Sequence, residues 1–232
     1  MTAAVVKQHL QTLAQPERAL MVARFFQTGP GQYAEGDLFM GMSIPQQRVV
    51  VRQFGALPMD ETEQLIQDPY HECRMAGLLI WVEQSRKSGP VGRQTILNRY
   101  LANVQHVNNW DLVDCSCPAI VGETLLYEDR SILYDLAVTD HLWSQRIAMV
   151  STLAFIRKNQ FADTFSLAER LLSHRHDLIH KAIGWMLRET GKRNSEALEE
   201  FLHDHIRQLP RTSLRYAIER FSPARRQYYL TL

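Results

Sequence analysis

Cysteine is scarce in this chain, which has 232 residues and only three cysteines. So few cysteines, and an odd number of them, exclude a disulfide-stapled fold and favour a reducing compartment. Cys115 and Cys117 form a Cys-Ser-Cys pair that lacks the spacing and the second ligand pair of a zinc site. His174, His176 and His180 likewise have no neighbouring carboxylate or cysteine to complete a metal site. We therefore expect no bound metal.

Long apolar runs are also missing. The longest stretches, such as Ala76–Val82, fall far short of the roughly 20 residues that span a bilayer. The N-terminus lacks the apolar core of a signal peptide, and the chain contains no glycine-rich phosphate loop, nucleophile elbow or cofactor signature. We expect a cytoplasmic protein that needs no membrane and no cofactor.

Net charge is almost absent as well, because 26 Lys and Arg face 25 Asp and Glu. The total hides a strong asymmetry. Residues 1–140 hold 11 basic and 16 acidic side chains, a net of −5, whereas residues 141–232 hold 15 and 9, a net of +6. A basic C-terminal half could bind a polyanion such as nucleic acid, or it could be an ordinary solvated surface.

What the chain does contain is helical periodicity. Apolar residues recur at intervals of three and four in segments such as 142–156, 179–187 and 214–221, and glycine or proline separates these segments. No segment shows sustained alternation with a period of two. The sequence predicts an all-α fold in a single domain over residues 1–232.

A degenerate repeat runs through these helices. Arg74, Arg146, Lys181 and Arg215 each open a small and apolar run, at intervals of 72, 35 and 34 residues. The first interval is two periods, so one repeat is missing near Trp110. This period predicts HEAT-like helix pairs stacked as a right-handed α-α superhelix with a concave, DNA-facing surface.

The four basic residues could form a track on that surface. Cations spaced by one repeat suit a phosphate backbone, because binding releases condensed counterions. Alternatively, each cation could cap or ion-pair a neighbouring helix. The spacing alone leaves both interpretations open.

A second constellation lies near the missing repeat. Trp110 and Asp114 are four residues apart, which places an indole and a carboxylate on one helix face. Aromatic faces attract cations and a carboxylate supplies the opposite charge, so together with Trp185 they suit a cationic ligand. Trp110 could instead be a core residue, with Asn109 or Asp111 as a helix N-cap.

Several segments share the motifs of one known family. Segment 33–48 follows the pattern Y-x-E-G-D-x-F-x-G-x-x-x-P-x-x-R, and N-W-D-L-V-D, W-S-Q-R-I-A and H-K-A-I-G-W-M-L-R-E follow at 109–114, 143–148 and 180–189. With segments 15–17 and 21–26, these motifs resemble the bacterial DNA alkylation repair family of HEAT-like DNA glycosylases over nearly the whole chain. Phe25 stands where the founding member has tyrosine, and Asn109 stands where it has a second tryptophan.

The resemblance implies an activity and roles for individual residues. The expected reaction is removal of N3-methyladenine and N7-methylguanine from double-stranded DNA by hydrolysis of the N-glycosidic bond, without base flipping. Asp114 would stabilise the sugar cation and orient a water, Trp110 and Trp185 would cradle the nucleotide, and Arg146 would hold a phosphate. Further DNA contacts are expected from Phe25, Arg48, Arg74, Lys181, Arg188 and Arg215.

Two other functions fit the same pattern. A non-catalytic binder of DNA structures would keep the basic track without using the carboxylate, and a protein-interaction scaffold would present it to an acidic partner. For the glycosylase, we expect a monomer with no obligate protein partner.

Overall fold

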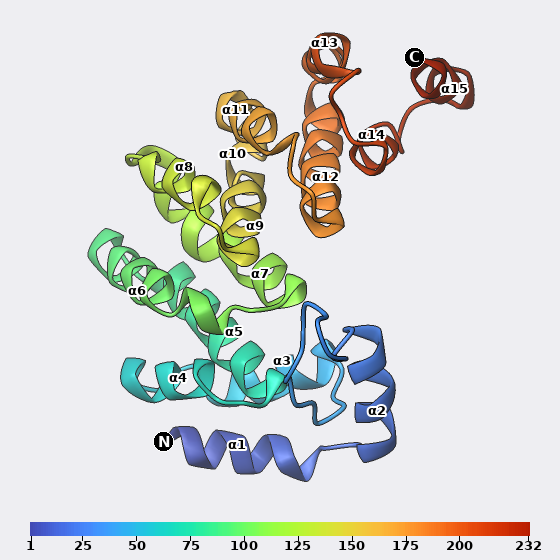
Figure 1. Cartoon of the computed structure of the whole chain (residues 1–232). Coiled ribbons are helices and arrows are strands. Elements are labelled where there is room, and N and C mark those ends of the chain that lie inside the picture. The colour runs from blue at the N-terminus through green and yellow to red at the C-terminus, as the bar shows by residue number, and fades with distance from the viewer. The chain divides into compact units, whose positions relative to one another are not determined.

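The structure is a computed structural model that describes residues 1–232, and all its regular elements are helical (Figure 1). A single isolated bridge joins Leu38 and Tyr70. The predicted all-α fold is therefore confirmed. None of the helices is both long and apolar enough to cross a membrane.

The chain divides into two compact units, Met1–Ser116 and Cys117–Leu232. The helices of the first unit follow one another from the N-terminus, and the last of them ends one residue past the boundary (Figure 1). They are α1 (Ala3–Thr12), α2 (Pro16–Phe25), α3 (Ile44–Gln53), α4 (Met59–Ile66), α5 (His71–Lys87), α6 (Pro90–Ala102), the short turn η1 (Val104–His106) and α7 (Trp110–Cys117).

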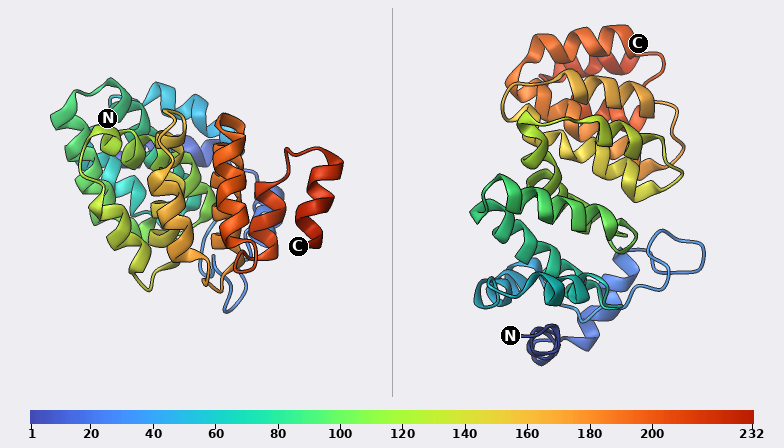
Figure 2. Two further views of the ribbon diagram at one scale, coloured as in Figure 1. Left: turned by 90° about the horizontal axis from the view of Figure 1, so that it is seen from above. Right: turned by 90° about the vertical axis from the view of Figure 1, so that its left-hand side faces the viewer.

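The second unit begins with two short helical turns and continues with α-helices of 4 to 17 residues. In Figure 2 its colours run from yellow-green to red. Its elements are η2 (Pro118–Gly122), η3 (Thr124–Tyr127), α8 (Ser131–Val138), α9 (Leu142–Ser151), α10 (Leu153–Ile156), α11 (Ala162–Leu171), α12 (Asp177–Arg193), α13 (Ser195–His205), α14 (Arg211–Ala217) and α15 (Pro223–Thr231).

Helix α5 forms the centre of the first unit. It packs against α3, α4 and α6, and α1 covers α3 and α4. Because neighbours surround it, α5 is buried on all sides over residues 71–82, including Leu78, Ile80 and Trp81. A helix that is buried all round belongs to the core.

Helix α12 has the same place in the second unit, where it contacts α9, α10, α11, α13 and α14. Its closest approach, to α14, requires glycine. A Cβ at Gly184 would lie 2.5 Å from the carbonyl oxygen of Ser213, so a larger residue would push the two helices apart.

The predicted repeat corresponds to similar positions near the start of successive helices. Arg74 is the fourth residue of α5, and Arg146, Lys181 and Arg215 are the fifth residues of α9, α12 and α14. Asp114 is the fifth residue of α7. The repeat that seemed to be missing is thus present, with a carboxylate where the other repeats have a cation.

Candidate functional site

Helix α7 carries the predicted pair of Trp110 and Asp114, and Asn109 determines where it begins. The Asn109 side chain is buried, and its Oδ1 accepts a hydrogen bond from the backbone N–H of Trp110 at 2.8 Å. The Asn109 carbonyl accepts the first intrahelical bond, from the N–H of Val113, at 3.1 Å. With the helix beginning here, Trp110 and Asp114 lie on one face of its first turns.

Trp110 belongs to an aromatic cluster and is only half-buried. Its indole stacks on Phe26, with 5.3 Å between ring centroids and 28° between planes, and Phe25 meets it edge-on at 6.1 Å. Phe26 is buried, whereas Phe25 is 66% exposed. Trp110 and Phe25 therefore both present ring surface to solvent, and Phe26 supports them from the interior.

Asp114 is half-buried in the next turn of α7. Burial, together with the negative charges of Asp111 and Asp114, raises the pKa of the Cys115 thiol to about 11, while Arg48 on α3 acts in the opposite direction. Cys115 is therefore protonated at neutral pH and is not an activated nucleophile. The exposed Arg48 is close enough to α7 to affect the same thiol as Asp114.

A buried charge cluster of Asp37, His71, Arg74 and Asp111 lies against the start of α7. His71 Nε2 is 2.9 Å from Asp111 Oδ2, and His71 Nδ1 is 3.6 Å from Asp37 Oδ2. Arg74 donates to Asp37 Oδ1 at 2.7 Å. All four residues are less than a tenth exposed, so each charge needs a partner.

The cluster shifts the pKa values of His71 and Asp37. Burial alone would lower the pKa of His71, but the carboxylates of Asp111 and Asp37 outweigh it and raise that pKa to about 9. Burial would also raise the pKa of Asp37, yet the nearby positive charges of His71 and Arg74 lower it. At neutral pH two cations and two anions therefore balance in the interior.

The motif at residues 33–48 forms the loop that supplies Asp37. Its backbone is held by Glu72, whose carboxylate accepts hydrogen bonds from the N–H groups of Met40 and Gly41 at 2.8 Å and of Met42 at 3.2 Å. Glu72 is 1% exposed. The motif loop thus supports the start of α7, and its Asp37 is the internal partner of the buried cations His71 and Arg74.

Arg74 was expected on an exposed basic row, and the structure corrects this placement. It is 4% exposed, and besides Asp37 its guanidinium donates to the carbonyls of Asp68 and Pro69, each at 3.0 Å. These partners occupy both terminal nitrogens. The alternative interpretation, in which a basic residue pairs inside the fold, applies to Arg74.

Helix α12 places three of the expected residues on one face. Lys181, Trp185 and Arg188 are separated by four and then three residues. Trp185 is half-buried beside a hollow that Leu153 and Ile156 also line. Lys181 pairs with Asp177 at 2.8 Å, but the two side chains are 41% and 54% exposed, so solvent screens the pair and it is weak.

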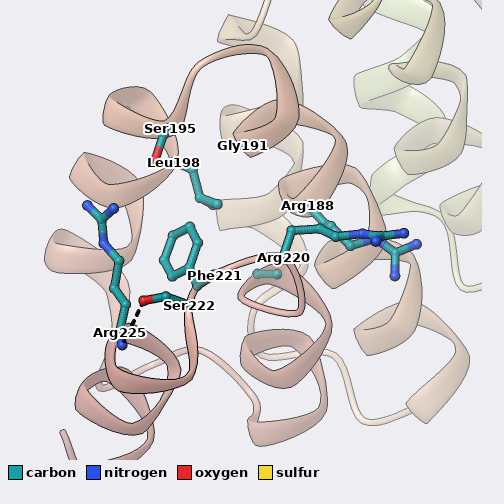
Figure 3. Close-up of a pocket in the computed structure, with 9 residues that line it drawn as sticks. Arg188, Gly191, Ser195, Leu198, Arg220, Phe221, Ser222 and Arg225 are labelled. Atoms are coloured by element: carbon teal, nitrogen blue, oxygen red, sulfur yellow. Dashed lines mark hydrogen bonds between the residues drawn. The ribbon is translucent and has the colours of Figure 1, made fainter.

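Arg188 borders a pocket that Arg220 and Arg225 also line. Figure 3 shows Arg188 and Arg220 extending to the same side of this pocket, and Arg225 lying across from them. Each arginine has an acidic partner: Arg188 and Arg220 lie next to Glu219, and Arg225 pairs with Glu199. All three arginines at the pocket therefore already have acidic partners, although Arg188 and Arg220 share one carboxylate.

The remaining two predicted residues differ in burial. Arg146 on α9 is 5% exposed, and its guanidinium donates to the carbonyl of Leu178 at the start of α12. Arg215 is exposed on α14. Of the four repeat cations, Lys181 and Arg215 therefore have the accessibility that a phosphate track requires.

Three supporting residues were not singled out from the sequence: His71, Glu72 and Asp111 in its role as partner of His71. The signal for them was weak. His71 and Glu72 stand at the start of a largely buried helix, and their partners lie about 30 to 40 residues away along the chain. Only the fold brings these groups together.

The chain is similar to known proteins in both sequence and fold. A family model described as "DNA alkylation repair enzyme" matches residues 6–221, which takes in most of both units. A solved structure, "Predicted DNA alkylation repair enzyme from Enterococcus faecalis", is similar with a TM-score of 0.71 and 17% identity, covering 90% of this chain and 97% of that one. At this identity the likeness shows the fold. No curated protein matches the chain.

Proposed function

The chain belongs to the DNA alkylation repair enzyme family, and on that premise we propose that it is an N-glycosylase for cationic alkylpurines in double-stranded DNA. Membership gives the chain a role in the repair of alkylated DNA. The finer proposal is the hydrolysis of the N-glycosidic bond of N3-methyladenine and N7-methylguanine, the lesions that the motifs imply.

The chemistry of these lesions defines the task. Alkylation leaves a positive charge on the purine, so the bond from C1′ to the ring nitrogen is already weak. When it breaks, its electron pair leaves with the base, which becomes neutral. A water oxygen then bonds to C1′ and releases a proton. The enzyme must mainly stabilise the oxocarbenium-like sugar between these events.

The observation that carries the proposal is the placement of Trp110 and Asp114 on one face of α7. Asp114 offers a negative charge to the sugar cation and an acceptor that orients the water. Trp110 offers an electron-rich ring to the same cation. Phe26 stacks beneath Trp110 and Asn109 caps the helix, so the indole and the start of α7 are held before substrate arrives.

Roles are also proposed for residues of the second unit. Trp185 would present an aromatic face to the nucleotide, and Arg146 would hold a backbone phosphate. For Arg146 this requires its guanidinium to leave the carbonyl of Leu178, because the side chain is 5% exposed and donates to that carbonyl in the free protein. Phe25, Arg48, Lys181, Arg188 and Arg215 would contact DNA. For Arg188 this requires a phosphate to displace the Glu219 carboxylate, because that pair exists in the free protein.

The decisive experiment measures single-turnover release of N7-methylguanine from a defined duplex. We expect Asp114→Asn to lower the rate by about a hundredfold or more while the Kd for DNA changes little, because the lost charge acts on the transition state. Asp135→Asn is the matched control, since Asp135 is an exposed carboxylate on α8. Equal rates in wild type and Asp114→Asn would reject the role of Asp114.

The other candidate functions are outcomes of the same experiment. Salt-sensitive duplex binding with no base release from either lesion would favour a non-catalytic DNA binder. Failure to bind duplex DNA at low salt would favour a protein scaffold. To test whether the base stays stacked, 2-aminopurine is placed opposite the lesion. Its fluorescence is quenched in the stack and should stay low when the protein binds. A strong rise would indicate flipping.

A further inference from the structure

We propose that His71 is a positioning residue for Trp110 and Asp114, which it holds through Asp111 and Phe26 at the start of α7. This inference rests on the proposed function. His71 lies 3% exposed beneath the site and touches neither solvent nor the face that would meet DNA. Its influence must therefore pass through its neighbours.

The first connection is polar. His71 Nε2 and Asp111 Oδ2 are 2.9 Å apart, and the other oxygen of Asp111 accepts a hydrogen bond from the N–H of Leu112 at 2.8 Å. Asp111 is the second residue of α7, between Trp110 and Asp114. Because the Asp111 carboxylate is held, the first turn of α7 is held in a fixed direction relative to its cap, Asn109.

The second connection is aromatic. The imidazole of His71 stacks on Phe39 at 4.8 Å and lies 5.1 Å from Phe26, and Phe26 in turn stacks under Trp110 at 5.3 Å. A rotation of the His71 ring would therefore displace the ring on which the Trp110 indole rests. The polar and aromatic connections reach the same turn of α7 from two directions.

The position of His71 is itself over-determined. The backbone N–H of His71 donates to the backbone carbonyl of Leu38 at 2.8 Å, and this bond joins α5 to the motif loop. The groups that face its ring are Asp37 from the loop, Asp111 from α7, and Arg74 from its own helix. With His71 protonated, these charges sum to zero; without its proton, one buried negative charge is left uncompensated.

This balance couples the site to protonation. Because burial is outweighed by the two carboxylates, the pKa of His71 lies at about 9. At neutral pH the imidazolium holds Asp111, and raising the pH past that value removes the proton. The start of α7 should then become less ordered, and the surroundings of the Trp110 indole should change with it.

The test uses the whole protein labelled with 5-fluorotryptophan. The Trp110 signal in the ¹⁹F spectrum is assigned by its absence in Trp110→Phe, and Trp81, Trp143 and Trp185 provide internal references. In the wild type we expect the Trp110 signal to shift with a midpoint near pH 9, the pKa of His71. In His71→Gln, which retains a neutral donor, this transition should disappear.

Base release at neutral pH supplies the second measurement. His71→Gln should release N7-methylguanine about tenfold more slowly, and His71→Phe, which keeps only the ring, more slowly still, with Kd for DNA within about threefold of wild type. Glu63→Gln is the control for lost stability, because it removes an ion pair with Arg99 that joins α4 and α6 in the same unit.

The outcomes separate the two proposals. If the wild-type protein releases no base but shows the Trp110 transition, the proposed function is rejected, whereas the positioning of Trp110 by His71 is retained. A neutral His71 imidazole at about pH 7, measured by ¹⁵N shifts in the wild type, would overturn this inference even if every variant failed to fold. Unchanged release in both His71 variants would also overturn it.

Discussion

The carboxylate of Glu72 holds the backbone N–H of Gly41 at 2.8 Å, in a turn where a side chain at position 41 has no room. Gly41 has a φ of +87°, and a Cβ built on it would lie 2.4 Å from the carbonyl oxygen of Gln15. The contact between Glu72 and Gly41 closes the motif loop onto α5. It explains both the glycine of the motif and the acid that follows His71.

This contact predicts a specific loss of stability. Gly41→Ala should lower the free energy of unfolding by about 3 kcal/mol or more, because it adds a backbone clash to the cost of a positive φ. Urea unfolding measures it. Gly36→Ala is the matched control, since Gly36 has a φ of +84° and open space around it. It should cost only about 1 kcal/mol. Equal losses would show that no clash exists at Gly41.

Stability should also fall with rising pH because of His71. Its folded pKa, at about 9, is above the ordinary value of 6.5. The stabilisation is therefore complete below about pH 6.5 and is lost as the pH rises through about 9, with a size of at most about 3 kcal/mol.

The measurement compares wild type and His71→Gln by urea unfolding between about pH 6 and pH 10. Burial raises the pKa of the Cys73 thiol too, and ionisation of that thiol in the unfolded chain also lowers stability at high pH. The difference between the two curves cancels this contribution. A difference that does not change with pH would show that His71 has an ordinary pKa.

Phe25 should matter for function more than for folding. Because it is 66% exposed, Phe25→Ala should change the free energy of unfolding by less than about 1 kcal/mol. Release of N7-methylguanine should nevertheless slow several-fold, because the edge contact with Trp110 is lost. Met21→Ala, one turn earlier on α2 and 64% exposed, is the control. Equal effects of the two substitutions on release would remove Phe25 from the site.

The repeat cations should separate into two groups. Arg74→Met should lower the free energy of unfolding by about 3 kcal/mol, because it leaves Asp37 as an underpaired buried charge. Arg215→Gln should leave stability nearly unchanged and reduce the slope of log K for DNA against log salt by about 1. If Arg74→Met were as stable as the wild type and reduced the slope, its side chain would contact DNA after all.

The helices and their repeat could be predicted from the sequence because both depend on local spacing. Trp110 and Asp114 share a helix face wherever residues 110–117 are helical, whatever the rest of the chain does. Arg74 shows where such inference ends. Its predicted position near the start of a repeat helix was right, yet its burial depends on Asp37, which is 37 residues away along the chain. No periodicity contains that partner.

Asn109 shows a related limit. From the sequence it was a departure from the tryptophan of the motif and one of two candidate helix N-caps. In the fold it caps α7, and its Nδ2 is 3.4 Å from Asp37 Oδ2. Its role depends on a loop that joins the site only after the chain has folded.

The first turn of α5 binds two other segments at once. His71 holds the start of α7, while Glu72 and Arg74 hold the motif loop. These segments should therefore open together rather than one by one. The amide protons of Met40, Gly41 and Met42 would exchange with solvent at the rate at which α7 frays. A ligand that ordered Trp110 would protect a loop about 70 residues earlier in the chain from exchange.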